Sequence, residues 1–275
     1  MTKTTKRVFF YFAVALFLIS SYVIILYAQG YKYSFSENRF FRTGAIYLKT
    51  NTSADVYLDD KLLGNTSFFN NSYRLEGLLP GRYVIRAQNN GYSTWQKSVT
   101  VDEGFVSEFS KILLLPQSGE GLEELDKEIA LIFLPPTPTP ISTPPTASSS
   151  ELFIIKKGVL STANEKGSDT LKEEYLTPLA ENVKGFVLSK DKNKLAWWTA
   201  NELWVMWLDS TNYQPYHKKG DKELITRFST QIKKTAWFRD EDHLIVNSNP
   251  STGSGQAGYK ILEIDTRGGI NIVEI

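Results

Sequence analysis

The chain has 275 residues, which is enough for two small domains and accessory segments. Its 31 Lys and Arg residues nearly balance its 30 Asp and Glu residues, so no broad basic surface is expected for a nucleic-acid backbone. The absence of cysteine excludes disulfide frameworks, cysteine metal sites and thiol nucleophiles. The only two histidines are His217, which we expect to be exposed, and His243, which we expect in a solvated hairpin. We therefore expect no nucleic-acid partner, no cofactor, no metal and no catalytic residue.

The N-terminal region contains a long uncharged segment, the 21 residues from Val8 to Ala28. A helix of this length spans about 30 Å, the thickness of the hydrocarbon core of a bilayer. A cleaved signal peptide ending near Ala28 is the alternative, but the apolar stretch is longer than a signal core and Leu26 suits a cleavage site poorly. We expect an uncleaved transmembrane helix over residues 8–29.

Basic residues flank this helix on both sides, namely Lys3, Lys6 and Arg7 before it and Lys32, Arg39 and Arg42 after it. The positive-inside rule is therefore nearly balanced. Because the leading charges lie directly beside the apolar segment, we expect a cytoplasmic tail over residues 1–7. The remainder of the chain is then extracytoplasmic, on a single-pass protein of the cell membrane.

Residues 30–116 alternate between apolar and polar positions in short runs, which is typical of antiparallel strands with one buried face. Tyr83, Ile85 and Ala87, for example, share one side of their run. Turn residues separate the runs, and we expect positive φ angles at Gly81 and Gly91. The pattern predicts a small β-sandwich.

Five motifs follow one another in this segment: Gly44–Leu48 (GAIYL), Ala54–Asp59 (ADVYLD), Gly64–Thr66 (GNT), Leu79–Tyr83 (LPGRY) and Gly91–Tyr92 (GY). Their order resembles the PEGA domain over about residues 43–116. Two turn positions depart from the family: Ser67 stands where Pro is usual, and Asp60 where Gly is common. The resemblance implies a bacterial or archaeal surface module with a binding or spacer role and no catalytic residues.

Residues 117–150 are expected to form a linker rich in Pro, Thr and Ser. Six of the 11 prolines lie between positions 135 and 150, where they prevent a hydrogen-bonded ladder and favour an extended spacer. We interpret Leu122 to Leu134, just before this stretch, as a short helical turn followed by a strand.

Residues 151–275 contain an internal repeat. Residues 186–198 align with 235–247 at an offset of 49, and residues 203–209 align with 259–265 at an offset of 56. A period near 50 built from short strands is typical of β-propeller blades, and we expect their fourth strands at Leu224–Phe228 and Asn271–Ile275. The pattern F-x-L-S-x-D-x-x-x-L-A, from Phe186 to Ala196, resembles the TolB-like, WD-type propeller repeat of bacterial envelope proteins.

This repeat region is too short for a closed propeller, which needs about four to eight blades. It supplies two blades and part of a third, over Glu151–Val183. We therefore expect an incomplete propeller whose last blade presents a hydrophobic face and edge without a partner. Blades from another molecule would complete it, but we favour a chain truncated from a longer protein.

Five of the six tryptophans lie in the repeat region, where strands between neighbouring blades need apolar residues on both faces. The alternative is an aromatic groove for sugar rings. The candidate contacts for a ligand or partner are Trp198, Trp204 and Tyr259.

The whole chain is expected to be mainly β: a transmembrane helix, a PEGA-like sandwich, a linker and propeller-like antiparallel sheets. The sequence predicts a non-enzymatic, membrane-anchored cell-surface protein that binds a protein or an envelope component. A carbohydrate-binding protein of the cell wall is the alternative, and a propeller hydrolase is less favoured because no nucleophile elbow, metal cluster or phosphate loop is present in the sequence.

Overall fold

The computed structural model describes residues 2–134, 152–163, 176–248 and 258–275. The chain is mainly β with an apolar N-terminal helix, and it divides into two compact units. The first unit contains Met1–Asn90 and Thr94–Leu114, and the second contains Gly91–Ser93 and Leu115–Ile275. Each unit is described by itself below.

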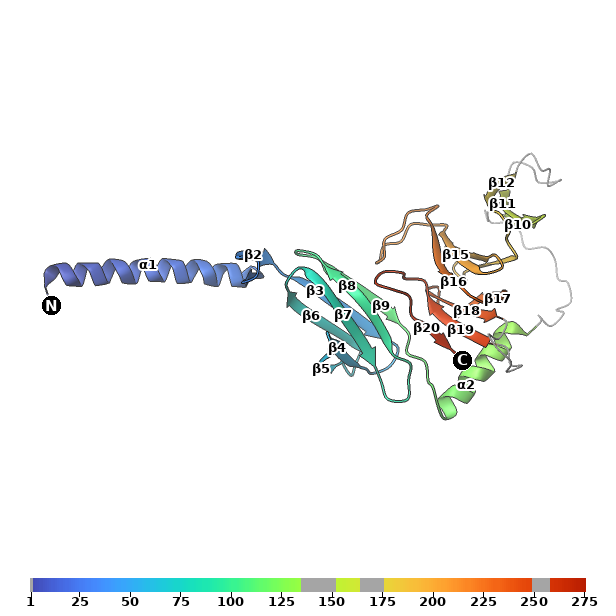
Figure 1. The fold of residues 1–275 in the computed structure, drawn as a ribbon, viewed down its shortest axis with the longest axis horizontal. Coiled ribbons are helices and arrows are strands. Elements are labelled where there is room, and N and C mark those ends of the chain that lie inside the picture. The colour runs from blue at the N-terminus through green and yellow to red at the C-terminus, as the bar shows by residue number, and fades with distance from the viewer. Residues whose placement is uncertain (1, 135–151, 164–175, 249–257) are drawn as a thin grey trace. The chain divides into compact units, whose positions relative to one another are not determined.

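The first unit begins with the helix α1, Lys3–Ala28 (Figure 1). The Thr2 hydroxyl caps it by accepting a hydrogen bond from the backbone N–H of Thr5. None of its residues is buried. A two-stranded hairpin follows, formed by β1 (Tyr31–Ser34) and β2 (Arg39–Arg42). The apolar helix expected from the sequence is thus present, and it begins five residues before Val8.

Two sheets make up the rest of the first unit. The three-stranded sheet has the order β6 (Ser72–Leu78), β3 (Gly44–Thr50), β9 (Val106–Ile112), and the four-stranded sheet has the order β5 (Lys61–Asn65), β4 (Asp55–Leu58), β7 (Gly81–Gln88), β8 (Trp95–Val101). Ile46 of the first sheet and Val56 and Ile85 of the second are fully buried. The rings of Trp95 and Phe109 contact each other at 5.3 Å, which links the two sheets.

Turn geometry in this unit agrees with the sequence at some positions and not at others. Gly91 has a φ of 78°, as expected. Gly81 does not adopt the left-handed region; it starts β7 and pairs with Val101, so the predicted positive φ was wrong there. Asp59 and Asp60 both have positive φ angles, 46° and 65°, and form the two-residue turn between β4 and β5.

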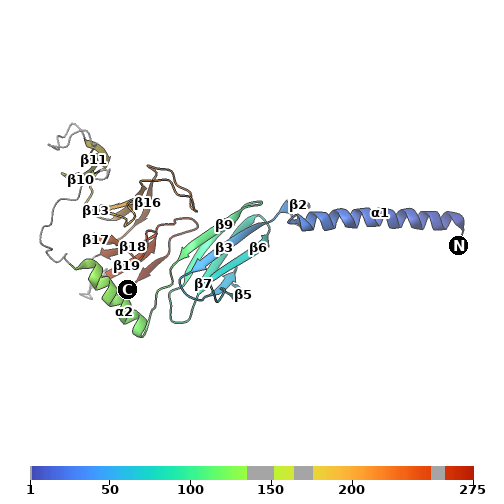
Figure 2. The ribbon, with the colours of Figure 1, turned by 180° about the vertical axis from the view of Figure 1, so that it is seen from behind.

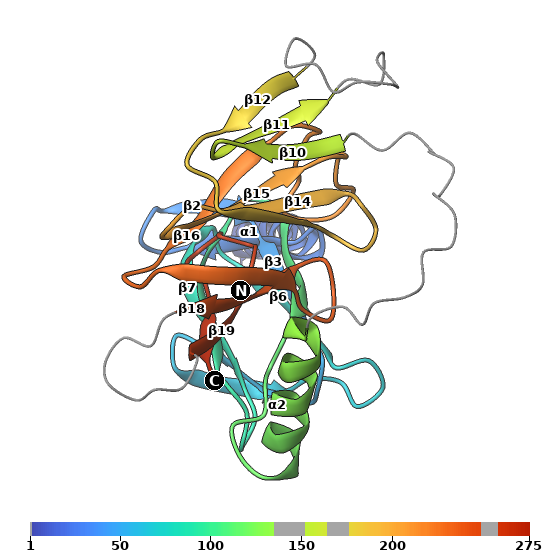
Figure 3. The same ribbon diagram turned by 90° about the vertical axis from the view of Figure 1, so that its right-hand side faces the viewer.

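The second unit contains three antiparallel sheets, which Figure 3 shows one after another. Their strands are β10 (Leu152–Lys156), β11 (Val159–Ala163) and β12 (Leu176–Ala180); β13 (Gly185–Leu188), β14 (Lys194–Trp198), β15 (Glu202–Trp207) and β16 (Lys222–Arg227); and β17 (Ile232–Trp237), β18 (His243–Ser248), β19 (Gly258–Glu263) and β20 (Ile272–Glu274). Strands β16 and β20 lie where the fourth strands of the repeat were expected. The sheets are open, and the described residues form no closed ring.

Two hydrophobic clusters join these sheets. Ala196 and Trp198 pack with Leu244 and Val246 between the two four-stranded sheets. Leu195 and Trp197 point to the other face of β14, where they join a cluster that includes Phe153 and Leu160. Successive side chains on a strand point to opposite faces, and every residue of β14 is nevertheless buried. The sheet β13–β16 is therefore covered on both sides.

A helix covers the far face of the last sheet. This helix, α2, runs from Glu120 to Phe133, within the stretch expected to be a linker, and the strand expected between Leu122 and Leu134 is wrong (Figure 2). Leu125 and Ile129 are its buried side chains, and their spacing of four residues places them on one helix face.

The contacts of α2 place it against β17–β20. The Phe133 ring stacks on the Tyr259 ring with the centroids 5.4 Å apart. The Glu128 carboxylate accepts three hydrogen bonds from the Arg239 guanidinium, two at 3.1 Å and one at 2.7 Å. Ile261 lies on the same face of β19 as Tyr259 and is 2 % exposed. The face that was expected to lack a partner is therefore covered by a segment of the same chain.

Candidate functional site

The first candidate feature is α1 itself. Its 26 residues are long and apolar enough to cross a membrane, and none of its most apolar stretch is buried against other described residues. An apolar helix left in water would expose a continuous hydrocarbon surface, whereas a bilayer covers that surface and leaves all backbone hydrogen bonds inside the helix. The helix is thus compatible with a membrane anchor.

A cleft of about 420 Å³ lies where α1 ends. Its walls come from the end of α1, from β1, and from the ends of β3, β6 and β9 nearest the helix; they include Tyr27, Lys32, Arg74 and Phe105. The Lys32 ammonium donates a hydrogen bond to the Gly77 carbonyl at 2.7 Å. The Arg74 guanidinium contacts the Glu76 carboxylate at 2.6 Å, so both basic groups of the cleft already have protein partners.

The structure separates the three aromatic residues singled out in the sequence. Trp198 is only 7 % exposed and belongs to the core between the two four-stranded sheets, so its ring offers no face to a ligand. Trp204 is half-buried, stacks on Trp197 at 5.9 Å and donates its indole N–H to the Glu202 carboxylate. Tyr259 stacks on Phe133 of α2. These residues therefore form no common aromatic surface.

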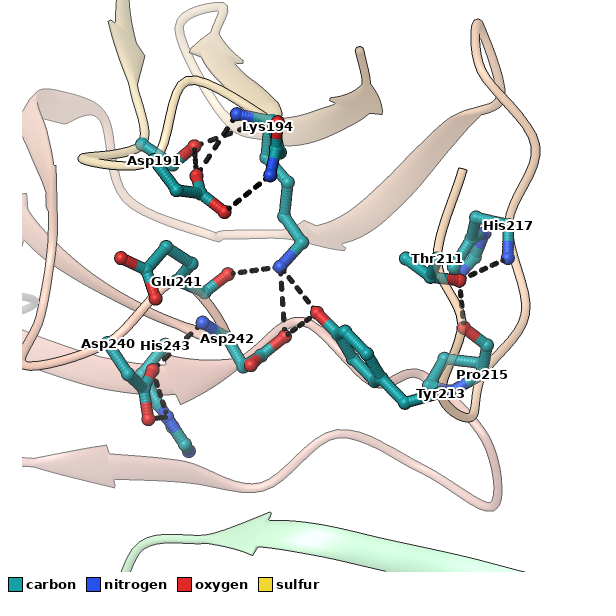
Figure 4. Close-up of polar contacts among 12 residues, drawn as sticks. Asp191, Lys194, Thr211, Tyr213, Pro215, His217, Asp240, Glu241, Asp242 and His243 are labelled. Carbon is teal, nitrogen blue, oxygen red and sulfur yellow. Dashed lines mark hydrogen bonds and ion pairs between the residues drawn. The ribbon is translucent and has the colours of Figure 1, made fainter. Parts of the chain in front are cut away.

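A buried polar cluster connects the two four-stranded sheets of the second unit, β13–β16 and β17–β20 (Figure 4). The Lys194 side chain, at the start of β14, is 3 % exposed. Its ammonium donates to the Tyr213 hydroxyl and the Glu241 carbonyl, both at 2.9 Å, and to the Asp242 carboxylate at 3.1 Å. The Tyr213 hydroxyl donates to the same carboxylate oxygen at 3.1 Å. The Lys194 ammonium thus joins three segments of the chain: β14, the loop that contains Tyr213, and the turn before β18.

Electrostatics favours the charged form of Lys194. Burial alone would lower the pKa of Lys194, but the Asp242 carboxylate and the Tyr213 hydroxyl outweigh burial, and the pKa is raised. Burial raises the pKa of Tyr213, which keeps this hydroxyl protonated as a donor. The Lys194 ammonium has three protein acceptors and joins the two sheets.

The β13–β14 and β17–β18 turns share one hydrogen-bond pattern, in which an Asp carboxylate accepts from the backbone N–H two residues later. In the offset of 49, Asp191 corresponds to Asp240 and Lys194 to His243. The Asp191 carboxylate accepts from the Asn193 N–H, and the Asp240 carboxylate accepts from the Asp242 N–H and contacts His243 Nδ1 at 2.9 Å. His243 is 4 % exposed, so the solvated hairpin expected from the sequence was wrong.

His217 also differs from its expected exposure. It is half-buried, and its ring stacks on Trp207 with the centroids 3.5 Å apart. Burial lowers the pKa of His217, although Glu223, Asp221 and Asp265 act in the opposite direction. Within the part of the chain that the structure describes, no three His, Cys, Asp or Glu residues are grouped as a metal site would require.

The repeat alignment held a signal for these polar contacts. It placed a buried Lys and a buried His at the same point of the two copies, directly after an acidic turn.

No family model matches this chain, and no curated protein matches it. The likenesses to the PEGA domain and to propeller repeats therefore rest on the motifs quoted for them.

Proposed function

We propose that this chain is a non-enzymatic, single-pass membrane protein whose β-rich body lies outside the cytoplasm and binds a protein partner. The observation that carries the proposal is α1, an apolar helix with no buried residue at the N-terminus of the chain. The basic residues Lys3, Lys6 and Arg7 in the first turns of that helix favour a cytoplasmic N-terminus.

The body suits display of binding surfaces. The two-sheet arrangement of residues 44–112 supports the proposed PEGA-like module, and the two four-stranded sheets with corresponding strands support the proposed propeller-like repeats. The buried Lys194 ammonium is engaged with the Asp242 carboxylate, which is typical of a structural ion pair.

One exposed aromatic pair supports a binding role. Phe68 and Phe69 lie in the turn between β5 and β6, are 90 % and 94 % exposed, and meet edge to face at 5.6 Å. Exposed Phe side chains cost solubility and are enriched at protein interfaces. The second candidate function, binding of a cell-wall glycan, is favoured by Trp204, which remains partly accessible on β15.

Two assays on the full chain in its native cells discriminate these functions. A photo-crosslinking amino acid in place of Phe68 should yield a defined protein adduct, and the same probe in place of Leu62, which is 54 % exposed on β5, should not. Cosedimentation with purified cell-wall sacculi that is lost in Trp204→Ala, without a protein adduct at position 68, would instead establish the glycan-binding alternative.

A further inference from the structure

The β1–β2 hairpin follows α1 directly and has two different faces. Only Gln29 and Gly30 separate the end of α1 from Tyr31. In the hairpin register Tyr33 pairs with Phe40, and Lys32 pairs with Phe41. Because paired residues share a face and neighbours alternate, Tyr33 and Phe40 lie on one face and Phe41 on the other.

The Phe41 face is fixed to the rest of the first unit. Phe41 is 8 % exposed, and Lys32 Nζ donates to the Gly77 carbonyl of β6. Thr43, directly after the hairpin, donates both its N–H and its hydroxyl to the Gly30 carbonyl at 2.8 Å. The hairpin is therefore held in place and cannot turn over to hide its other face.

The Tyr33 face carries a row of aromatic rings that begins in α1. Tyr27 of α1 contacts Phe40 at 6.4 Å between centroids, Phe40 contacts Tyr33 at 5.1 Å, and Tyr33 contacts Phe35 at 5.1 Å. Phe35 stands at the hairpin tip and is 86 % exposed. The aromatic row thus leads from the apolar helix to a bare phenyl ring in water.

Basic side chains lie on both faces of the hairpin. Arg42 pairs with Tyr31 and shares the face of the aromatic row, whereas Lys32 and Arg39 lie on the Phe41 face, where the Arg39 guanidinium is 4.0 Å from the centroid of the Phe41 ring. All three are exposed, against a single acid, Glu37, in the turn. A second bare ring, Phe105, is 70 % exposed in the turn before β9, beside the cleft at the end of α1. Aromatic rings with Lys and Arg at the end of an apolar helix are the composition that favours the headgroup region of a bilayer.

We propose that the β1–β2 hairpin is a membrane-interface anchor, with the rings of Tyr33, Phe35 and Phe40 in the headgroup region of the bilayer that α1 spans. Arg42, on the same face as these rings, then meets lipid phosphates. The inference rests on the membrane anchoring proposed above, and the continuity of the aromatic row with α1 selects lipid over a protein partner as the occupant. The hairpin holds the first unit close to the membrane, whereas a flexible connection would let it swing.

The absence of cysteine makes depth measurements direct, because each new cysteine carries the only label. The full chain is reconstituted in vesicles of phosphatidylcholine and phosphatidylglycerol, and an NBD fluorophore is attached at Ser36→Cys, beside Phe35. Ser67→Cys is the matched control, since it lies beside the equally bare Phe68 in another turn of the same unit. Leu18→Cys reports on α1.

Lipids with a nitroxide near the headgroup should quench the label at position 36 and leave the label at 67 unquenched. Adding Phe35→Ser should reduce the quenching at 36 by at least about twofold, because that ring supplies much of the apolar contact. Equal quenching at positions 36 and 67, or no effect of Phe35→Ser on the quenching at 36, overturns the inference. It is also overturned if the NBD label at position 36 enters an apolar environment only when another protein is added.

The label at position 18 separates the two proposals. Quenching at 18 by a nitroxide deep in the acyl chain, without quenching at 36, leaves the membrane anchor in place and overturns the interfacial hairpin. No quenching at 18 overturns the anchor, and the hairpin inference with it.

Discussion

The buried ammonium of Lys194 allows a quantitative test of how the two four-stranded sheets are joined. Lys194→Met keeps most of the side-chain volume and removes the charge. It leaves the Asp242 carboxylate, the Tyr213 hydroxyl and the Glu241 carbonyl without their shared donor. A substitution on β14 should therefore destabilise the contact with the sheet that contains β18.

The size of the effect follows from what remains. Removing one member of a buried ion pair costs about 3–5 kcal/mol. Asp242 is 14 % exposed and keeps the hydrogen bond from Tyr213, so we expect the lower end of this range, about 3 kcal/mol, for Lys194→Met. Tyr213→Phe removes a neutral hydroxyl and should cost about 1 kcal/mol. The double variant Lys194→Met with Asp242→Leu should lose less free energy of unfolding than the sum of the losses in the two single variants, and the difference should be about 1–3 kcal/mol.

Urea unfolding of the detergent-solubilised full chain, followed by tryptophan fluorescence, measures these differences. Five of the six tryptophans belong to the second unit, so the signal reports on the sheets that the cluster joins. Arg227→Met is the matched control: its partner Glu202 also lies on this sheet, but Arg227 is 68 % exposed, and we expect a loss below about 1 kcal/mol. A loss of similar size in Lys194→Met and Arg227→Met, or strict additivity in the double variant, would refute the reasoning.

Three further predictions follow from single positions. Asp60→Gly should stabilise the first unit by up to about 1 kcal/mol in thermal unfolding, because Gly adopts the positive φ of this hairpin turn without a Cβ penalty; a lower melting temperature would contradict this. Gly44→Ala should destabilise the same unit by about 2 kcal/mol or more, since an added Cβ would lie 2.5 Å from a Val101 methyl and 2.6 Å from a backbone carbonyl; an unchanged urea midpoint would show that the strand can shift. Because burial lowers the pKa of His217, this histidine binds a proton more strongly in the unfolded state, and the free energy of unfolding should fall as the pH falls below about 6.5. His217→Phe keeps a ring on Trp207 and should flatten this pH dependence. An identical pH profile of stability in both proteins would count against the prediction.

Local patterns predicted most of the strands. In β7, Ile85 and Ala87 are buried as their alternation requires, and the repeat offset located β16 and β20 without any knowledge of their partners. These elements were predictable because side-chain period and turn residues are properties of neighbouring positions.

The errors arose where distant segments meet. The apolar run Ile129–Phe133 was interpreted as a strand, although Leu122, Leu125 and Ile129 already followed a helical spacing. Covering the last sheet with α2 depends on a contact between residues more than 100 positions apart, such as Glu128 and Arg239, which no local pattern contains. The same holds for Lys194 and Asp242: the sequence shows a basic strand start and an acidic turn, and only the packing of two sheets brings them together.

The placement of the body relative to the membrane is the claim on which the proposed function depends. A membrane-impermeant maleimide added to spheroplasts that produce single-cysteine variants of the full chain tests it directly. Lys61→Cys, in the exposed β4–β5 turn region, should be labelled in intact spheroplasts, and Thr4→Cys, before the apolar stretch, only after detergent is added. Labelling of Thr4→Cys in intact spheroplasts with Lys61→Cys protected would contradict the account, as would recovery of the full chain in the soluble fraction.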